Sequence, residues 1–118
     1  MKQVELKKGN QTLVPKCWVA NSFVSRFMGL MGKKGIPADE AVCFPKCNSV
    51  HTFFMRFPID VIRLDGNGVV IDVVLGMKPW RMLAPSMKVK HMVEMRSQRS
   101  QELGIVAGEK LSCEGVWN

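Results

Sequence analysis

The chain contains no tyrosine, and its six phenylalanines and three tryptophans form no aromatic and basic motif of the RNA-recognition kind. Its lysines and arginines are scattered, with no run longer than two, although the net charge is +7. A positive charge of this size favours anionic partners in general and does not by itself indicate nucleic acid. The sequence therefore predicts a solvated basic surface and argues against nucleic-acid binding.

Long hydrophobic runs are also missing. The longest, residues 69–77, is interrupted by Asp72 and Gly76, which is too short and too polar for a membrane span. The first residues, MKQVELKK, lack the apolar centre of a secretory signal. With 118 residues the chain has the length of one domain. We expect a single domain over residues 1–118, cytoplasmic and monomeric.

None of the four cysteines forms a C-x-x-C pair, which argues against a thioredoxin-type redox site and a zinc ribbon. Without a secretory signal, the prediction is four reduced thiols, and the alternative is two disulfides in a chain from which a leader has been removed. Cys43, Cys47 and His51 follow one another at intervals of four, but Pro45 opposes a helix that would place them on one face. We therefore predict no metal site and no cofactor.

The hydrophobic pattern predicts a mainly β domain, a small closed or partly open β-barrel or sandwich with one N-terminal amphipathic helix. Phe23, Phe27 and Met31 recur at intervals of four and predict that helix over residues 21–34. Gly35 and Pro37 would end it. A single helical turn is expected over 101–104, and strands are expected over 2–6, 12–19, 41–44, 49–55, 59–64, 69–75, 91–95 and 110–114.

One stretch, CNSVHTFFMRFPIDV over residues 47–61, carries a resemblance that covers most of the chain. RFMGLM (26–31), the turn at 65–70, and Val93-Glu94 followed by LGI (103–105) and Gly108-Glu109 agree with it in order. Together these segments resemble domain-of-unknown-function family 192, small bacterial and archaeal proteins, in its His-Thr-Phe branch. The resemblance implies a compact β-barrel-like domain without an assigned activity, and fold alone would not fix function.

Polar residues in the same stretch are the candidate site. Counting back from the corner at 56–58 places His51 opposite Asp60 on neighbouring strands, and we predict that His51 donates a hydrogen bond to Asp60. Arg56 and Glu94 could join this group. It either holds the sheet together as a structural polar network or lines a ligand site in the mouth of the barrel.

Three functional hypotheses follow. The first is non-catalytic binding of a small molecule or a protein partner at His51, Arg56, Asp60 and Glu94. The second is a hydrolase or transferase in which Cys47 is the nucleophile, His51 the base and Asp60 the residue that orients it. The third is an accessory module of a larger assembly that acts through its basic surface. A formed pocket would support the first hypothesis, a reactive Cys47 the second, and an exposed apolar patch the third.

Overall fold

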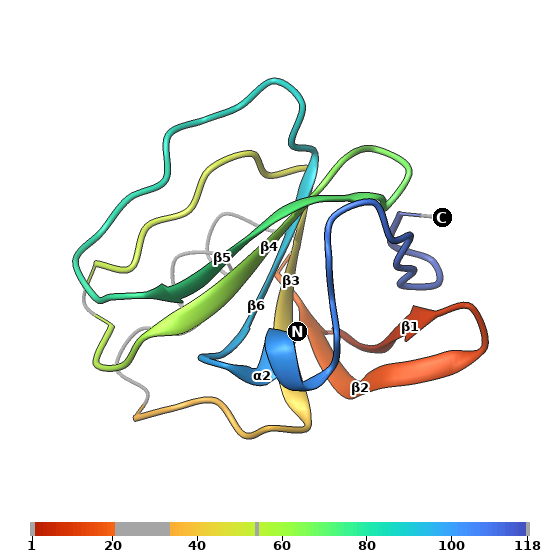
Figure 1. Ribbon diagram of the computed structural model, residues 1–118, viewed down its shortest axis with the longest axis horizontal. Coiled ribbons are helices and arrows are strands. Elements are labelled where there is room, and N and C mark those ends of the chain that lie inside the picture. The colour runs from red at the N-terminus through yellow and green to blue at the C-terminus, as the bar shows by residue number, and fades with distance from the viewer. Residues whose placement is uncertain (1, 21–33, 54, 118) are drawn as a thin grey trace.

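The computed structural model describes residues 2–20, 34–53 and 55–117. The helix expected over 21–34 lies almost wholly outside these residues. One six-stranded sheet organises the described part of the chain, in the order β1-β2-β3-β6-β4-β5 (Figure 1). Its strands are β1 (Lys2–Lys8), β2 (Gln11–Val19), β3 (Glu40–Pro45), β4 (Ile59–Leu64), β5 (Val70–Met77) and β6 (His91–Arg96). A short helix, α2, spans Arg99–Glu102.

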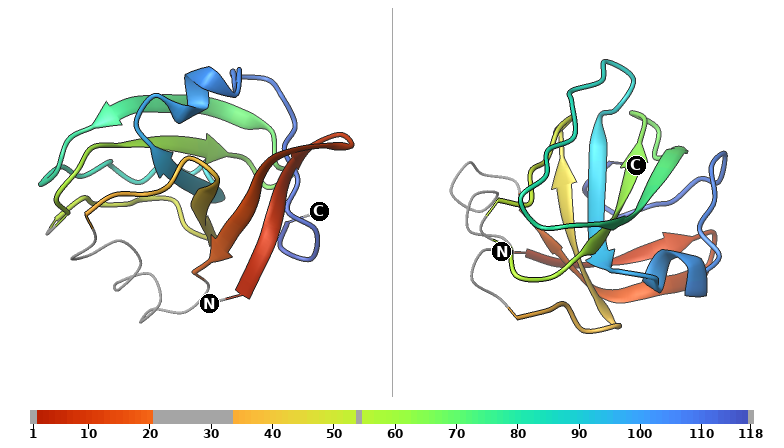
Figure 2. Two further views of the ribbon diagram at one scale, coloured as in Figure 1. Left: turned by 90° about the horizontal axis from the view of Figure 1, so that it is seen from below. Right: turned by 60° about the vertical axis from the view of Figure 1, so that its left-hand side comes forward.

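The mainly β prediction is confirmed, and the sheet is open, because β1 and β5 are its two edges. All neighbouring strands are antiparallel except β2 and β3, which run parallel. Figure 2 shows how strongly the sheet curves. The C-terminal segment, residues 108–113, crosses from one edge to the other, since Ser112 bonds to Lys7 of β1 and Leu111 bonds to Gly68 just before β5.

Two expected strands are corrections. Residues 110–114 bridge the sheet edges through isolated pairs and form no strand. Residues 49–55, where described, also form no strand, because their partner is the loop after β5; one isolated bridge joins His51 to Met82. Apolar alternation predicts an extended chain there, but only hydrogen-bonding partners along its length make such a chain a strand.

Both faces of the sheet are buried, and each carries its own core. Strand residues alternate between the faces, so Ile62 and Val93 belong to one core while Val61 and Met92 belong to the other. The curled β1–β2 hairpin and the residues that follow α2 cover the first core with Leu6, Val14, Ile105, Leu111 and Trp117. Loop residues Val50, Met55, Leu83 and Val89 contribute to the second. No helix in the described part of the chain is long and apolar enough to cross a membrane.

The cysteine prediction is wrong. Cys17 of β2 and Cys43 of β3 form a disulfide, with 6.3 Å between their Cα atoms. The parallel register pairs Cys17 with Ala41 and Val19 with Cys43, so the two cysteines are diagonal neighbours on one face. The prediction of reduced thiols rested on the missing signal sequence, which carries no information about the register of β2 and β3. Cys47 and Cys113 are free thiols.

Candidate functional site

The predicted contact between His51 and Asp60 does not form. Asp60 is fully buried at the start of β4, where one carboxylate oxygen accepts the Gly76 N–H and the other accepts the Ser100 N–H and hydroxyl. His51 lies on the exposed surface, and its Nδ1 accepts the Phe53 N–H. The prediction failed because the counting assumed two paired strands, whereas β4 pairs instead with β5 and β6.

Asp60 has a structural role in this arrangement. The residue preceding α2, Gln98, makes no side-chain capping bond, and the first-turn N–H of Ser100 is taken up by Asp60 instead. The carboxylate thus fixes α2 to the sheet and also holds the Gly76 N–H of the edge strand. A buried carboxylate with three donors is well compensated, which explains how a charge is accommodated among the apolar residues of β4.

Glu94 lies on the opposite face of the sheet from Asp60. The β4–β6 register pairs Asp60 with Met95 but Glu94 with Val61, and neighbouring positions along a strand face opposite ways. Val42 of β3 is the partner of Glu94 on its other side. The residue is 3% exposed, and burial raises the pKa of its carboxyl to about 8. The polar cluster of His51, Arg56, Asp60 and Glu94 is therefore not assembled as one site.

The surface residues of that cluster belong instead to a pair of loops. Residues 46–53 and 55–57 run alongside residues 78–90 in the opposite direction, seen as the yellow and teal traces left of the strands in Figure 1. Backbone bonds join them at three levels: Cys47 to Lys90, Val50 to Leu83, and Thr52 to Arg81. We call this unit the two-loop arm. His51 and Arg56 lie on its first loop, and both are exposed.

A buried threonine holds the two loops together. The Thr52 hydroxyl donates to the Lys78 carbonyl at 2.6 Å and accepts the Arg81 N–H at 2.8 Å. Its backbone N–H donates to Arg81, and its carbonyl accepts the Trp80 N–H. Trp80 is thereby held at φ 64°, a left-handed conformation that costs a non-glycine residue energy and that often accompanies functional sites.

This conformation leaves Trp80 exposed over 56% of its surface. Its ring stacks on Phe53 at 5.9 Å between centroids, and Phe53 stacks on His51 at 4.8 Å. We call these three rings the aromatic platform. The exposed Arg81 directly follows Trp80 in the chain. Of these three residues, only His51 was predicted to belong to the site.

The arm is uniformly basic. Residues 41–59 and 73–93 contain no aspartate or glutamate, and their six lysines and arginines supply most of the net charge of +7. All six are exposed: Lys46, Arg56, Lys78, Arg81, Lys88 and Lys90. These six residues are scattered along the chain, and the pairing of the two loops brings them together on one arm of the fold. The lack of acidic residues in both segments is visible in the sequence. It indicates a basic surface only once the two segments are known to pair.

A surface pocket of about 590 Å³ lies at the base of the arm, lined by Lys46, Cys47, Asn48, Gly66, Val89, Lys90 and His91. The His91 ring stacks on Trp117 at 5.0 Å, accepts the Lys46 N–H at Nδ1, and hydrogen-bonds the Gly66 backbone. Burial lowers the pKa of His91, outweighing the opposing effects of the Gly66 bond and Asp65. Its imidazole is therefore held neutral and in place, as part of the pocket wall.

The proposed Cys47–His51–Asp60 triad is not assembled. The Cys47 thiol donates to the Ser49 carbonyl at 3.0 Å, His51 bonds within its own loop, and Asp60 is buried at α2. In the described part of the chain, the side chains of a metal-binding type that lie together are Cys17, Cys43 and Cys113. Cys47 is not among them. Cysteine catalysis needs a base within hydrogen-bond reach of the thiol, and neither predicted partner provides it.

Comparison with known families agrees with the resemblance in the sequence. The model of domain-of-unknown-function family 192 (DUF192), described as "Uncharacterized ACR, COG1430", matches residues 4–113. The chain belongs to this family. Its relatives include a UPF0127 protein of Pyrococcus furiosus, 34% identical over 84% of each chain. Another, from Pyrococcus horikoshii, is 37% identical over 64% of this chain and 68% of its own.

A solved structure of distant sequence has the same fold. A protein of unknown function from Novosphingobium aromaticivorans superposes with a TM-score of 0.78 at 18% identity, over 93% of this chain and 83% of its own. At this identity the likeness establishes the fold and leaves function open.

Proposed function

We propose that this DUF192 domain is a non-catalytic binding module that holds a small anionic ligand with a flat ring on the two-loop arm. The observation that carries the proposal is the conjunction of the exposed aromatic platform with two loops that carry six cations and no acidic residue. A ring of the ligand would stack on Trp80, and its anionic group would meet Arg81 or Arg56.

Rigidity supports binding at this place. Loop tips usually move, and ordering a mobile loop on binding weakens affinity. Here the four Thr52 bonds fix the Lys78–Arg81 turn before any ligand arrives. The Thr52 hydrogen bonds outweigh the local cost of the left-handed conformation at Trp80. This conformation presents a large ring to solvent.

Charge supports an anionic ligand over a neutral one. Because neither loop of the arm carries an acidic residue, its exposed cations create a local positive potential, which raises both the capture rate and the affinity for anions. Guanidinium groups also bind phosphate and carboxylate in a two-point geometry. Because the cations here are exposed, their contribution should weaken as salt rises.

Calorimetric titration with three probes separates these contributions. AMP offers a ring and a phosphate, adenosine only the ring, and ribose 5-phosphate only the phosphate. We expect AMP to bind most tightly. We expect Trp80→Ala to weaken AMP binding about tenfold, within the range for one lost stacking contact, and Arg81→Gln to weaken it by about the same factor through one lost charge-assisted bond.

Two exposed residues outside the arm provide matched controls. Leu75→Ala removes a side chain that is 52% exposed on β5, and Lys110→Gln removes one exposed positive charge. Neither should change AMP binding by more than the error of measurement. Failure of all three probes to bind, or AMP affinity unchanged in Trp80→Ala, would refute the proposed function.

A further inference from the structure

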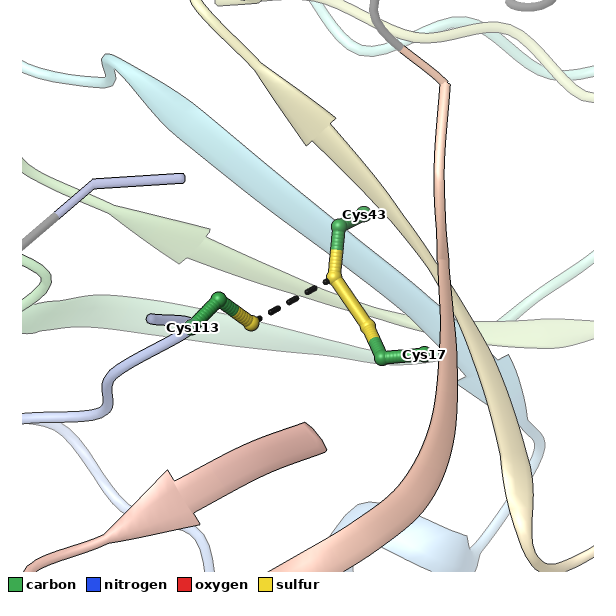
Figure 3. Close-up of side chains that lie close together, drawn as sticks. All are labelled: Cys17, Cys43 and Cys113. Carbon is green, nitrogen blue, oxygen red and sulfur yellow. Dashed lines mark hydrogen bonds between the residues drawn. A yellow bond between two sulfur atoms is a disulfide. The ribbon is translucent and has the colours of Figure 1, made fainter. Parts of the chain in front are cut away.

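Three buried sulfur atoms meet in the core, away from the two-loop arm. Cys17, Cys43 and Cys113 come from β2, β3 and the C-terminal segment, and their sulfurs lie within 4.8 Å of one another (Figure 3). All three residues have no exposed surface. Cys17 and Cys43 are joined, and the Cys113 sulfur lies 3.7 Å from that of Cys43.

The third thiol is placed against a disulfide that it could attack. A buried cysteine often serves only as a small apolar residue. In this cluster, however, the Cys113 sulfur lies 3.7 Å from the Cys43 sulfur, beside the disulfide bond; thiol–disulfide exchange needs this proximity and a turn of the Cys113 side chain into line with the bond.

We propose that the three cysteines form an intramolecular exchange site in which Cys43 alternates between Cys17 and Cys113. The Cys113 thiolate attacks the Cys43 sulfur, the Cys17–Cys43 bond breaks, and a Cys43–Cys113 bond forms. The electron pair leaves on the Cys17 sulfur, which takes up the proton that Cys113 released. The number of disulfides and thiols is unchanged, so the step needs no oxidant and no reductant.

The exchange would move a covalent link between two parts of the fold. The present bond joins neighbouring parallel strands, with a separation of 26 residues. The alternative bond would join β3 to the C-terminal segment, with a separation of 70 residues. That segment crosses both sheet edges through Leu111 and Ser112. The alternative disulfide would therefore fasten the crossing segment to the centre of the sheet.

Burial makes the site slow and selective. It raises the pKa of the Cys113 thiol to about 12, so the attacking thiolate is scarce in the closed core. Outside thiols cannot reach the cluster without local opening. Exchange among the three neighbours is consequently favoured over reaction with soluble disulfides.

The test locates the single free thiol of the cluster in a Cys47→Ser protein. The native protein is incubated in sub-denaturing urea, then unfolded in acidic denaturant to stop exchange and labelled with N-ethylmaleimide. Peptide mass spectrometry should find the label on Cys113 and, in a second population, on Cys17. The same protein carrying Cys113→Ser should contain only the Cys17–Cys43 bond and take up no label.

A second variant keeps the test decisive if the alternative bond is rare. In the same Cys47→Ser background, Cys17→Ser leaves Cys43 and Cys113 as thiols, and oxidised glutathione added in the same sub-denaturing urea, where the cluster opens, should then join them in one disulfide. Label confined to Cys113 after prolonged incubation, together with Cys43 and Cys113 both remaining alkylatable in oxidised Cys17→Ser, would overturn the proposal.

Discussion

Replacing Glu94 by glutamine should stabilise the protein at neutral pH. The carboxyl is buried at the centre of the sheet between Val42 and Val61, and burial raises its pKa from 4.5 to about 8. In the unfolded chain the same group ionises near its ordinary value. Between these two values the folded state retains a proton that the unfolded state has lost, so unfolding is favoured as pH rises.

The size of this effect follows from the pKa difference. Each unit of pH between the two pKa values costs about 1.4 kcal/mol of stability. At pH 7 the penalty is therefore about 3 kcal/mol, and it levels off near 5 kcal/mol above the folded pKa of about 8. Below pH 4.5 both states are protonated, and the penalty is absent. Glutamine is nearly the same shape as the protonated acid and carries no charge at any pH.

The assay is urea unfolding, followed by tryptophan fluorescence, of the wild type and Glu94→Gln at intervals from pH 4 to 9. Other groups titrate in both proteins, so the difference between their free energies of unfolding isolates Glu94. That difference should be close to zero near pH 4.5 and reach about 3 kcal/mol in favour of the variant at pH 7. Glu114→Gln, at an exposed position, should show no such change. A difference that does not vary between pH 4.5 and 8 would show the reasoning to be wrong.

Three further substitutions test the packing. Asp60→Asn should lower the free energy of unfolding by about 1–3 kcal/mol, because the amide cannot accept all three donors, and chemical denaturation measures it. Gly68→Ala should cost at least about 2 kcal/mol, since the added carbon would lie 2.4 Å from the Leu111 carbonyl oxygen at a positive φ. Gly66→Ala, with its nearest contact at 3.7 Å, is the control, and equal thermal shifts for the two would contradict the argument. Gln98→Gly should raise stability by about 1 kcal/mol by relieving φ 78°, and a lowered melting temperature would show that the conformation is not strained.

The sequence alone determined which segments are extended and which family the chain belongs to. Six of the expected strands are present, with ends shifted by one or two residues, and the family model matches residues 4–113. Alternation of apolar residues and turn signals such as DGNG over 65–68 are local properties, and local interactions suffice to predict them. The single turn expected over 101–104 likewise appears as α2 at Arg99–Glu102.

Only the tertiary structure decided which residues meet. His51 and Asp60 are separated because β4 lies between β5 and β6, and Cys17 reaches Cys43 because β2 and β3 are parallel neighbours. The basic charges gather because two loops far apart in the chain are fastened by Thr52. Strand order and register arise from burying both faces of the sheet at once, a condition on the whole chain that no single segment reveals.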